Sequence, residues 1–204
     1  MFGVILVFGA AASFAEEVRS VGACRIRPGT LCTSMNLTGA NLKDANLAHA
    51  QFSRSVLAGA DLSGANLDQS DLSRADLRKA NLHSASLVRA NARGARFDGA
   101  NLGGANLKGA ALQNANLSEA DLTKANLGGA DIGNARLDGA RLQGADLQRA
   151  NLRAASLKGA SLAEAQLQGV NFNGADLTDA DLTGANIDRA NFSLARTAGC
   201  KGCP

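Results

Sequence analysis

Few side chains in this chain of 204 residues have chemistry that reaches beyond structure: there are four cysteines and two histidines. His49 and His83 both fall at variable positions, with no nucleophile or metal-ligand spacing around them, so we interpret them as solvated surface residues. Asp and Asn recur at one fixed spacing, which suits hydrogen bonds to nearby backbone better than acid–base catalysis. The sequence therefore predicts no catalytic, metal or cofactor site, and no enzymatic activity.

The cysteines form two pairs, one near each end of the chain. Cys24 and Cys32 flank a Pro-Gly turn, so we predict a local disulfide that closes a small loop. Cys200 and Cys203 form a Cys-x-x-Cys motif without the alternating strand and helix pattern of a redox protein. We predict a second local disulfide there, and a bridge between two chains is the alternative.

The first fifteen residues differ from the rest. An apolar stretch leads to Ser13 and Ala15, the small residues that signal peptidase prefers, and Glu16 follows at once. The stretch is shorter than the roughly 20 apolar residues that span a bilayer. We predict a signal peptide at residues 1–15, no membrane insertion of the mature chain, and a secreted or periplasmic location. The alternative is a cytoplasmic chain that packs this segment on its domain.

One spacing governs the chain from Met35 onward. Every fifth residue from Leu37 to Phe192 occupies an apolar slot, which gives 32 slots without an insertion, and only Ala92 is small. Ala usually lies two residues earlier, and Asn or Asp usually lies between the two. The last two residues of each unit vary and are often Gly.

This period fits neither regular element. On an α-helix, five residues turn about 500°, so no apolar face forms. On a strand, side chains alternate with period 2, so an odd repeat would send successive Leu residues to opposite faces. The spacing instead predicts a coil in which each pentad is one side. Ala and Leu point inward, Asn or Asp points outward, and the last two residues turn a corner.

The segments "GADLSGANL", "KANLGGADI" and "GADLTDADL" resemble the pentapeptide-repeat family, whose motif is A-(D/N)-L-x-x. The resemblance implies an all-β fold, a right-handed quadrilateral β-helix with four repeats in each of about eight coils. The period alone does not separate four sides from three. We place the β-helix at residues 35–197, an N-terminal cap at residues 16–34 and a C-terminal cap at residues 198–204.

The small residue Ala92 interrupts the row of large apolar slots. The next slot holds Phe97, which is larger than Leu. Because protein interiors tolerate few voids, we predict that the Phe97 ring fills the space beside Ala92.

The net charge of +3, with acids and bases interleaved, gives no strong attraction to nucleic acid. With four sides, residues 20 apart stack on one face. The face centred on Phe52, Leu72 and Ala92, here called the arginine face, carries more Arg than Asp. Its charged residues include Arg54, Arg74, Arg93, Arg153, Asp71 and Asp131. We interpret this face as an ordinary solvated surface; the alternative is that its four arginines form a candidate face that binds an acidic partner.

These observations favour a non-enzymatic secreted or periplasmic scaffold whose flat faces bind an unidentified protein. A homodimer through one end of the rod is a further possibility, since a stacked coil leaves unpaired backbone at its ends. The family resemblance also implies an alternative function, a cytoplasmic DNA-mimicking regulator of DNA gyrase of the quinolone-protection type. That function needs an acidic surface, whereas this chain has a positive net charge.

Overall fold

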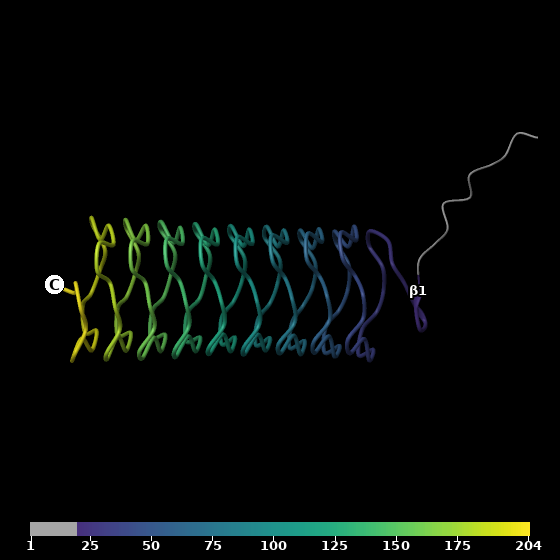
Figure 1. Cartoon of the computed structure of the whole chain (residues 1–204), viewed down its shortest axis with the longest axis horizontal. Helices are drawn as coiled ribbons and strands as arrows, with labels where there is room; N and C mark the ends of the chain where they lie inside the picture. Colours follow the sequence, from purple (N-terminus) through teal and green to yellow (C-terminus); the bar gives the residue numbers. More distant parts are fainter. Residues whose placement is uncertain (1–19) are drawn as a thin grey trace, which may run out of the picture.

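The computed structural model describes residues 20–204, so the predicted signal peptide at residues 1–15 lies outside the described residues. The described chain is a straight rod of stacked coils (Figure 1). Two short strands, β1 (Ser20–Val21) and β2 (Cys24–Arg25), form an antiparallel hairpin at the N-terminal end. Residues 20–204 contain no helix, and so none with the length and apolarity needed to cross a bilayer.

Parallel backbone bridges hold each coil to the next. They pair the residue before each apolar slot with the residue 20 positions later, from Leu31 with Gln51 to Asp181 with Lys201. Twenty residues are four pentads, so the rod has four sides, the number that the period left open. The ladder also takes in residues assigned to the caps, because Cys32 occupies an apolar Leu slot.

The hydrogen bonds of one pentad show how a side and a corner form. The Leu57 N–H donates to the Asp76 carbonyl of the next coil (2.7 Å), and the Asp76 N–H donates back to the Ser55 carbonyl (2.9 Å). The Ala60 N–H donates to the Leu57 carbonyl (3.0 Å) and closes a turn. Gly59, the third residue of that turn, has a φ of 65°, as a type II turn requires.

Ala and Leu fill the interior, as the pattern predicts. Nearly all of them between Leu37 and Leu182 are fully buried, and they form one continuous core. Ala92 and Phe97 are both buried. Near the C-terminal end, the rings of Phe172 and Phe192 stack with their centroids 5.0 Å apart.

Asn and Asp recur on the outer surface of the coil because their side chains accept hydrogen bonds from the following corner. The Asp61 Oδ1 atom accepts hydrogen bonds from the Ser63 N–H (3.0 Å) and the Ser63 hydroxyl (2.7 Å). It also accepts one from Asn81 Nδ2 on the next coil (3.1 Å). The same two-residue bond to backbone recurs along the rod, for example from the Thr38 N–H to Asn36 (3.1 Å).

The two ends of the rod differ. At the N-terminal end, Cys24, Thr30 and Cys32 are buried beside the β1–β2 hairpin. At the other end, Phe192 is only partly buried and Leu194 is 85 % exposed. The core is therefore closed at one end and open at the other.

Candidate functional site

The corner that follows the arginine face carries two arginines. Arg54 and Arg74 occupy the same turn position in successive coils, both with positive φ. Because neighbouring strands lie about 4.8 Å apart, the two side chains leave the rod at that spacing. The preceding turn position holds Thr33, Ser53 and Ser73, so a row of hydroxyl groups runs beside the arginines.

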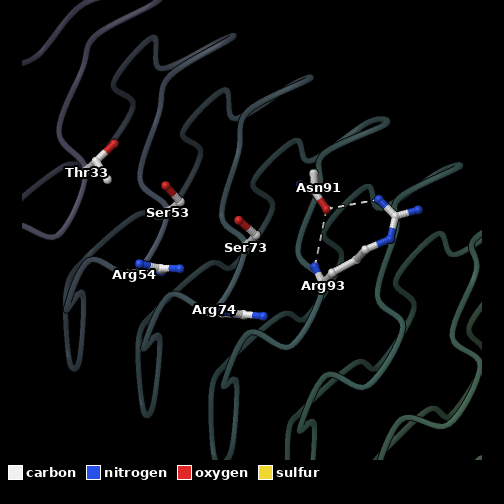
Figure 2. A pocket seen from close by; sticks show the side chains of 7 residues that line it. All are labelled: Thr33, Ser53, Arg54, Ser73, Arg74, Asn91 and Arg93. Carbon is white, nitrogen blue, oxygen red and sulfur yellow. Dashed lines mark hydrogen bonds between the residues drawn. The ribbon is translucent and has the colours of Figure 1, made fainter.

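These two rows enclose a hollow of ≈ 460 Å³, which we call the arginine groove. Its lining residues are Thr33, Ser53, Arg54, Ser73, Arg74, Asn91 and Arg93 (Figure 2). Arg93 occupies the same turn position as Thr33, Ser53 and Ser73, in the next coil. Its Nη1 atom donates a hydrogen bond to Asn91 Oδ1 (3.3 Å), which orients the guanidinium. Three of the four arginines predicted on this face therefore line one groove.

The groove arginines have no acidic partner of their own. Within residues 20–204, neither Arg54, Arg74 nor Arg93 forms an ion pair. The nearby carboxylate of Asp71 accepts hydrogen bonds from the Ser73 N–H (2.9 Å) and from Asn91 Nδ2 (3.0 Å). Arg54 and Arg74 thus keep their guanidinium donors available for carboxylate or phosphate groups, and Arg93 keeps those that do not bond Asn91.

Arg153 does not join them. It lines a second hollow of ≈ 370 Å³ three coils further along the same face, together with Asp131. The Asp131 carboxylate accepts a hydrogen bond from Asn151 Nδ2 (2.9 Å) and another from Gln113 Nε2. This second hollow therefore contains both a carboxylate and a guanidinium group. It differs in charge from the arginine groove, and Arg153 is not part of that groove.

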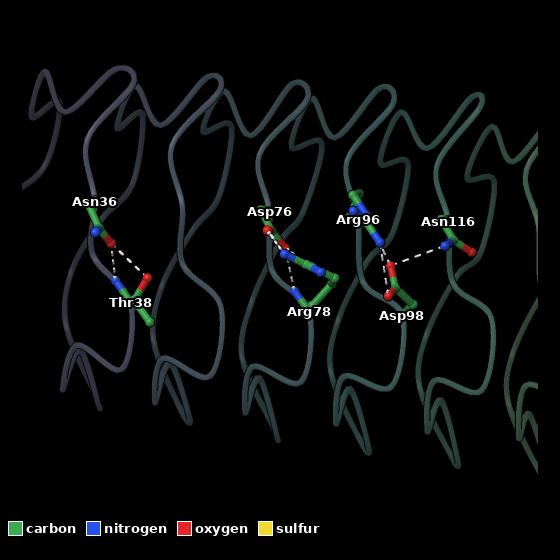
Figure 3. A network of polar contacts seen from close by, with 7 residues as sticks. All are labelled: Asn36, Thr38, Asp76, Arg78, Arg96, Asp98 and Asn116. Carbon is green, nitrogen blue, oxygen red and sulfur yellow. Dashed lines mark hydrogen bonds and ion pairs between the residues drawn. The ribbon is translucent and has the colours of Figure 1, made fainter.

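The adjacent face, centred on Leu77 and Phe97, shows the opposite arrangement (Figure 3). Arg78 and Asp76 form an ion pair with an N–O distance of 2.6 Å, and Arg96 and Asp98 form another at 3.3 Å. The hydrogen bond from Arg78 to Asp76 holds the pKa of that carboxyl below its usual value. We call this the paired face, because neighbouring side chains neutralise much of its charge.

Charge is also distributed unevenly along the rod. Residues 20–100 carry ten Lys and Arg against six Asp, whereas residues 101–204 carry ten bases and ten acids. The arginine groove therefore lies in the half with the positive excess, where an acidic partner is attracted at longer range.

The remaining candidate side chains lie apart from the groove. His83 lines a separate hollow on another face, and His49 is an exposed corner residue. In residues 20–204 there is no group of three or more His, Cys, Asp or Glu side chains arranged to hold a metal ion. No described cluster of this kind offers a site for a metal cofactor.

The four cysteines form disulfides within the chain. Cys24 is bonded to Cys32, and Cys200 is bonded to Cys203. The first bond lies in the buried N-terminal end, and the second joins half-buried residues beside the open end. The two disulfides therefore cross-link the chain near the two ends of the rod, and both lie apart from the arginine groove.

Counting only the charged residues on each face does not identify the uncharged residues that line the groove. Thr33, Ser53, Ser73 and Asn91 line it, yet none carries a charge. Reading the sequence at intervals of 20 residues shows the row of hydroxyl residues, but its value depends on knowing that four pentads make a coil.

Comparison with known proteins agrees with this architecture. The family model described as pentapeptide repeats matches in eight copies, over residues 36–74, 75–114, 100–139, 135–174 and 160–196. HetL, from the cyanobacterium Nostoc sp. strain PCC 7120, is 31 % identical with a TM-score of 0.57. That match covers 83 % of this chain and 86 % of HetL, which is described as involved in heterocyst differentiation regulation. No curated protein matches the chain.

Two other solved structures are more distant in shape. QnrB1, a plasmid-mediated fluoroquinolone resistance protein, is 20 % identical with a TM-score of 0.39, over 80 % of this chain and 84 % of its own. A thylakoid-lumen protein of Arabidopsis thaliana is 31 % identical with a TM-score of 0.25, over 61 % and 66 %. The repeat-by-repeat match and the four-sided ladder together show that the chain is a right-handed quadrilateral β-helix and belongs to the pentapeptide-repeat family.

Proposed function

We propose that this chain is a non-enzymatic scaffold whose arginine groove binds an acidic protein partner. The observation that carries the proposal is the grouping of Arg54, Arg74 and Arg93 in one hollow without ion pairs. The arginines of the paired face differ, because Arg78, Arg96 and Arg136 each have an Asp within 4 Å.

The geometry favours a partner that presents carboxylates in a regular row. Arg54 and Arg74 are spaced by one coil, about 4.8 Å, which is also the spacing between side chains on neighbouring strands of a sheet. Ser53 and Ser73 add neutral hydroxyl donors at the same spacing. An acidic ladder on the surface of a β-sheet protein would therefore meet one arginine and one hydroxyl group per strand.

We also place the protein in a secreted or periplasmic compartment. Two disulfides in a small rod suit an oxidising environment, and residues 1–15 have the composition of a signal peptide. Intact-mass measurement of the natively expressed protein tests this placement. We expect a chain that starts at Glu16 and lacks four cysteine hydrogens, whereas an uncleaved, fully reduced chain would refute the location and leave the groove proposal standing.

The groove itself is tested with a fluorescent poly-glutamate peptide and three proteins. The triple variant Arg54→Glu, Arg74→Glu, Arg93→Glu reverses the charge of the groove. A matched variant reverses the same number of bases outside it, at Lys108, Lys124 and Arg149, which also lack ion pairs. Fluorescence anisotropy at low salt gives the affinity of each protein for the peptide.

We expect the groove variant to lose at least about tenfold in affinity, since three guanidinium contacts are replaced by repulsion. The matched variant has the same net charge and should lose much less. Equal losses in the two variants would refute the groove and leave only a net-charge effect. Tighter binding of single-stranded DNA than of the peptide would assign the groove to nucleic acid instead.

The gyrase-regulator alternative gains no support from the surface. DNA mimicry requires a row of exposed acids, yet residues 20–100 have four more bases than acids and residues 101–204 are balanced. The likeness to QnrB1, at 20 % identity, concerns the fold alone.

A further inference from the structure

The open end of the rod, residues 185–204, has an excess of backbone donors. In its last full coil, seven N–H groups at positions that elsewhere donate to the next coil have no backbone acceptor among residues 20–204: those of Ile187, Arg189, Phe192, Leu194, Thr197, Gly199 and Gly202. Only four carbonyls of that coil lack a donor in the same way: those of Ala185, Ala190, Ala195 and Cys200. An unpaired edge of this kind is a template for pairing with another chain.

Apolar side chains surround these donors. Ile187 and Phe192 are only partly buried, and Leu194 is 85 % exposed at a corner with a φ of 61°. The Phe192 ring stacks on Phe172 in the coil below, so the stack ends at the open face. A docking coil would cover this apolar surface and satisfy the donors together.

The donor excess argues against two such ends meeting head to head. Seven donors of one copy would then face seven donors of the other, with four acceptors on each side. Inside the rod, the same donors bond to the next coil: the Leu177 N–H to the Arg196 carbonyl (2.7 Å) and the Asp179 N–H to the Ala198 carbonyl (2.8 Å). The complementary surface is therefore the opposite end of a coil, which presents carbonyls.

The N-terminal end of a second copy presents such carbonyls in register. Within the described chain, the Asn36 and Thr38 carbonyls accept no hydrogen bond. Both lie on the same face as Thr197 and Gly199. In the 20-residue repeat, Asn36 and Thr38 have the positions from which a further coil would supply acceptors for the Thr197 and Gly199 N–H groups. Stacking one copy on another would pair the Thr197 N–H with the Asn36 carbonyl and the Gly199 N–H with the Thr38 carbonyl.

The β1–β2 hairpin of the second copy would block this junction sterically. Residues 21–24 and 201–204 have the same phase in the 20-residue repeat, so a stacked pair of copies has room for only one of the two segments. The hairpin is fixed where it is by the buried Cys24–Cys32 disulfide. The obstacle is thus the overlap between the hairpin of one copy and residues 201–204 of the other.

We propose that the open end is an assembly surface for the N-terminal end of a second copy, and that the disulfide-closed hairpin prevents this head-to-tail stacking. Because the two contact surfaces are different, assembly would not close into a dimer but continue into a filament. The proposal is independent of the arginine groove, which lies on the side of the rod.

The test compares the full oxidised chain with the variant Cys24→Ser, Cys32→Ser by sedimentation velocity and negative-stain electron microscopy. We expect the oxidised chain to be monomeric. We expect the variant to form unbranched filaments that are as wide as a single β-helix and grow in length. Adding Leu194→Arg should return the variant to monomers by placing a charge on the open end. The matched change Asn114→Arg lies at the same corner in mid-rod, with a similar φ of 58°, and should leave the rods intact.

Three results would overturn the proposal. These are a double cysteine variant that is folded but monomeric, an oxidised chain that already forms filaments, and rods that persist with Leu194→Arg. If the cysteine variant loses the circular dichroism of the β-helix, Val21→Lys loosens the hairpin without removing the disulfide, and the same outcomes apply.

Discussion

At the scale of single residues, one small side chain interrupts the row of large apolar side chains in the interior. Ala92 is the one small residue in an apolar slot, and it is as buried as the leucines around it. Phe97 follows one pentad later and is completely buried. The prediction that the Phe97 ring fills the space beside Ala92 is therefore open to test by mutation.

This pairing predicts coupled effects on stability. Ala92→Leu should destabilise the rod by about 1–3 kcal/mol, because we expect the Phe97 ring to fill the space that the added side chain would need. Phe97→Leu should cost about 1 kcal/mol by opening a cavity. The double variant should come within about 1 kcal/mol of the wild type in urea unfolding. If Ala92→Leu alone stabilises the protein, the space beside Ala92 is empty and the pairing is wrong.

At the scale of the pentad, one polar side chain fastens each corner. In the corner that follows Asp61, the carboxylate accepts both the hydroxyl and the N–H of Ser63. The Ser63 hydroxyl bond, with the backbone bond next, lowers the pKa of Asp61 below its ordinary value of 3.8. Asn makes the same backbone bond at other corners without a charge, as at Asn36.

The lowered pKa predicts a dependence of stability on acid. A carboxyl with a depressed pKa contributes stability that is fully present above pH 3.8 and is lost as the pH falls through its folded-state pKa. Asp61→Asn keeps an acceptor but removes the titration, so it should reduce the loss of unfolding free energy between pH 5 and pH 2. Urea unfolding of both proteins across that range measures the difference, and identical profiles would contradict it.

The pentad is also where sequence and structure agree best. A five-residue period, Gly at corners and Asn or Asp between Ala and Leu are enough to predict a coil with an apolar interior. Four sides require contacts between residues 20 apart, which a period of five does not contain. The grouping of Arg54, Arg74 and Arg93 without Arg153 depends on Ser53 and Ser73, whose small size leaves the hollow. The β1–β2 hairpin lies outside the repeat, so the period says nothing about it.

At the scale of the whole molecule, the rod is a stack in which each coil contacts only its neighbours. Whole units can therefore be removed without disturbing the rest of the fold, as in other repeat proteins. Removing one pentad turns every later residue back by one side. Removing four pentads restores the original faces and shortens the rod by about 4.8 Å.

Two deletions use this geometry to test the groove. Deleting residues 61–65 should leave a folded β-helix but move Arg74 to a different corner from Arg54, so poly-glutamate binding should fall by about tenfold. Deleting residues 101–120 should leave binding unchanged, since it preserves the groove and all four faces. Circular dichroism confirms folding, and anisotropy reports affinity. Full binding by the shorter deletion would show that the arginines act independently.

The direction of the bonds between coils has an electrostatic consequence. In each pentad, two N–H groups donate toward the end that carries residue 204, as those of Leu37 and Gly39 do, and one donates back, as that of Asp61 does. The peptide dipoles therefore do not cancel, unlike those of an ordinary sheet. They leave the open end partially positive and the hairpin end partially negative. The excess of Lys and Arg in residues 20–100 lies in the half nearer the negative pole, where cations are stabilised.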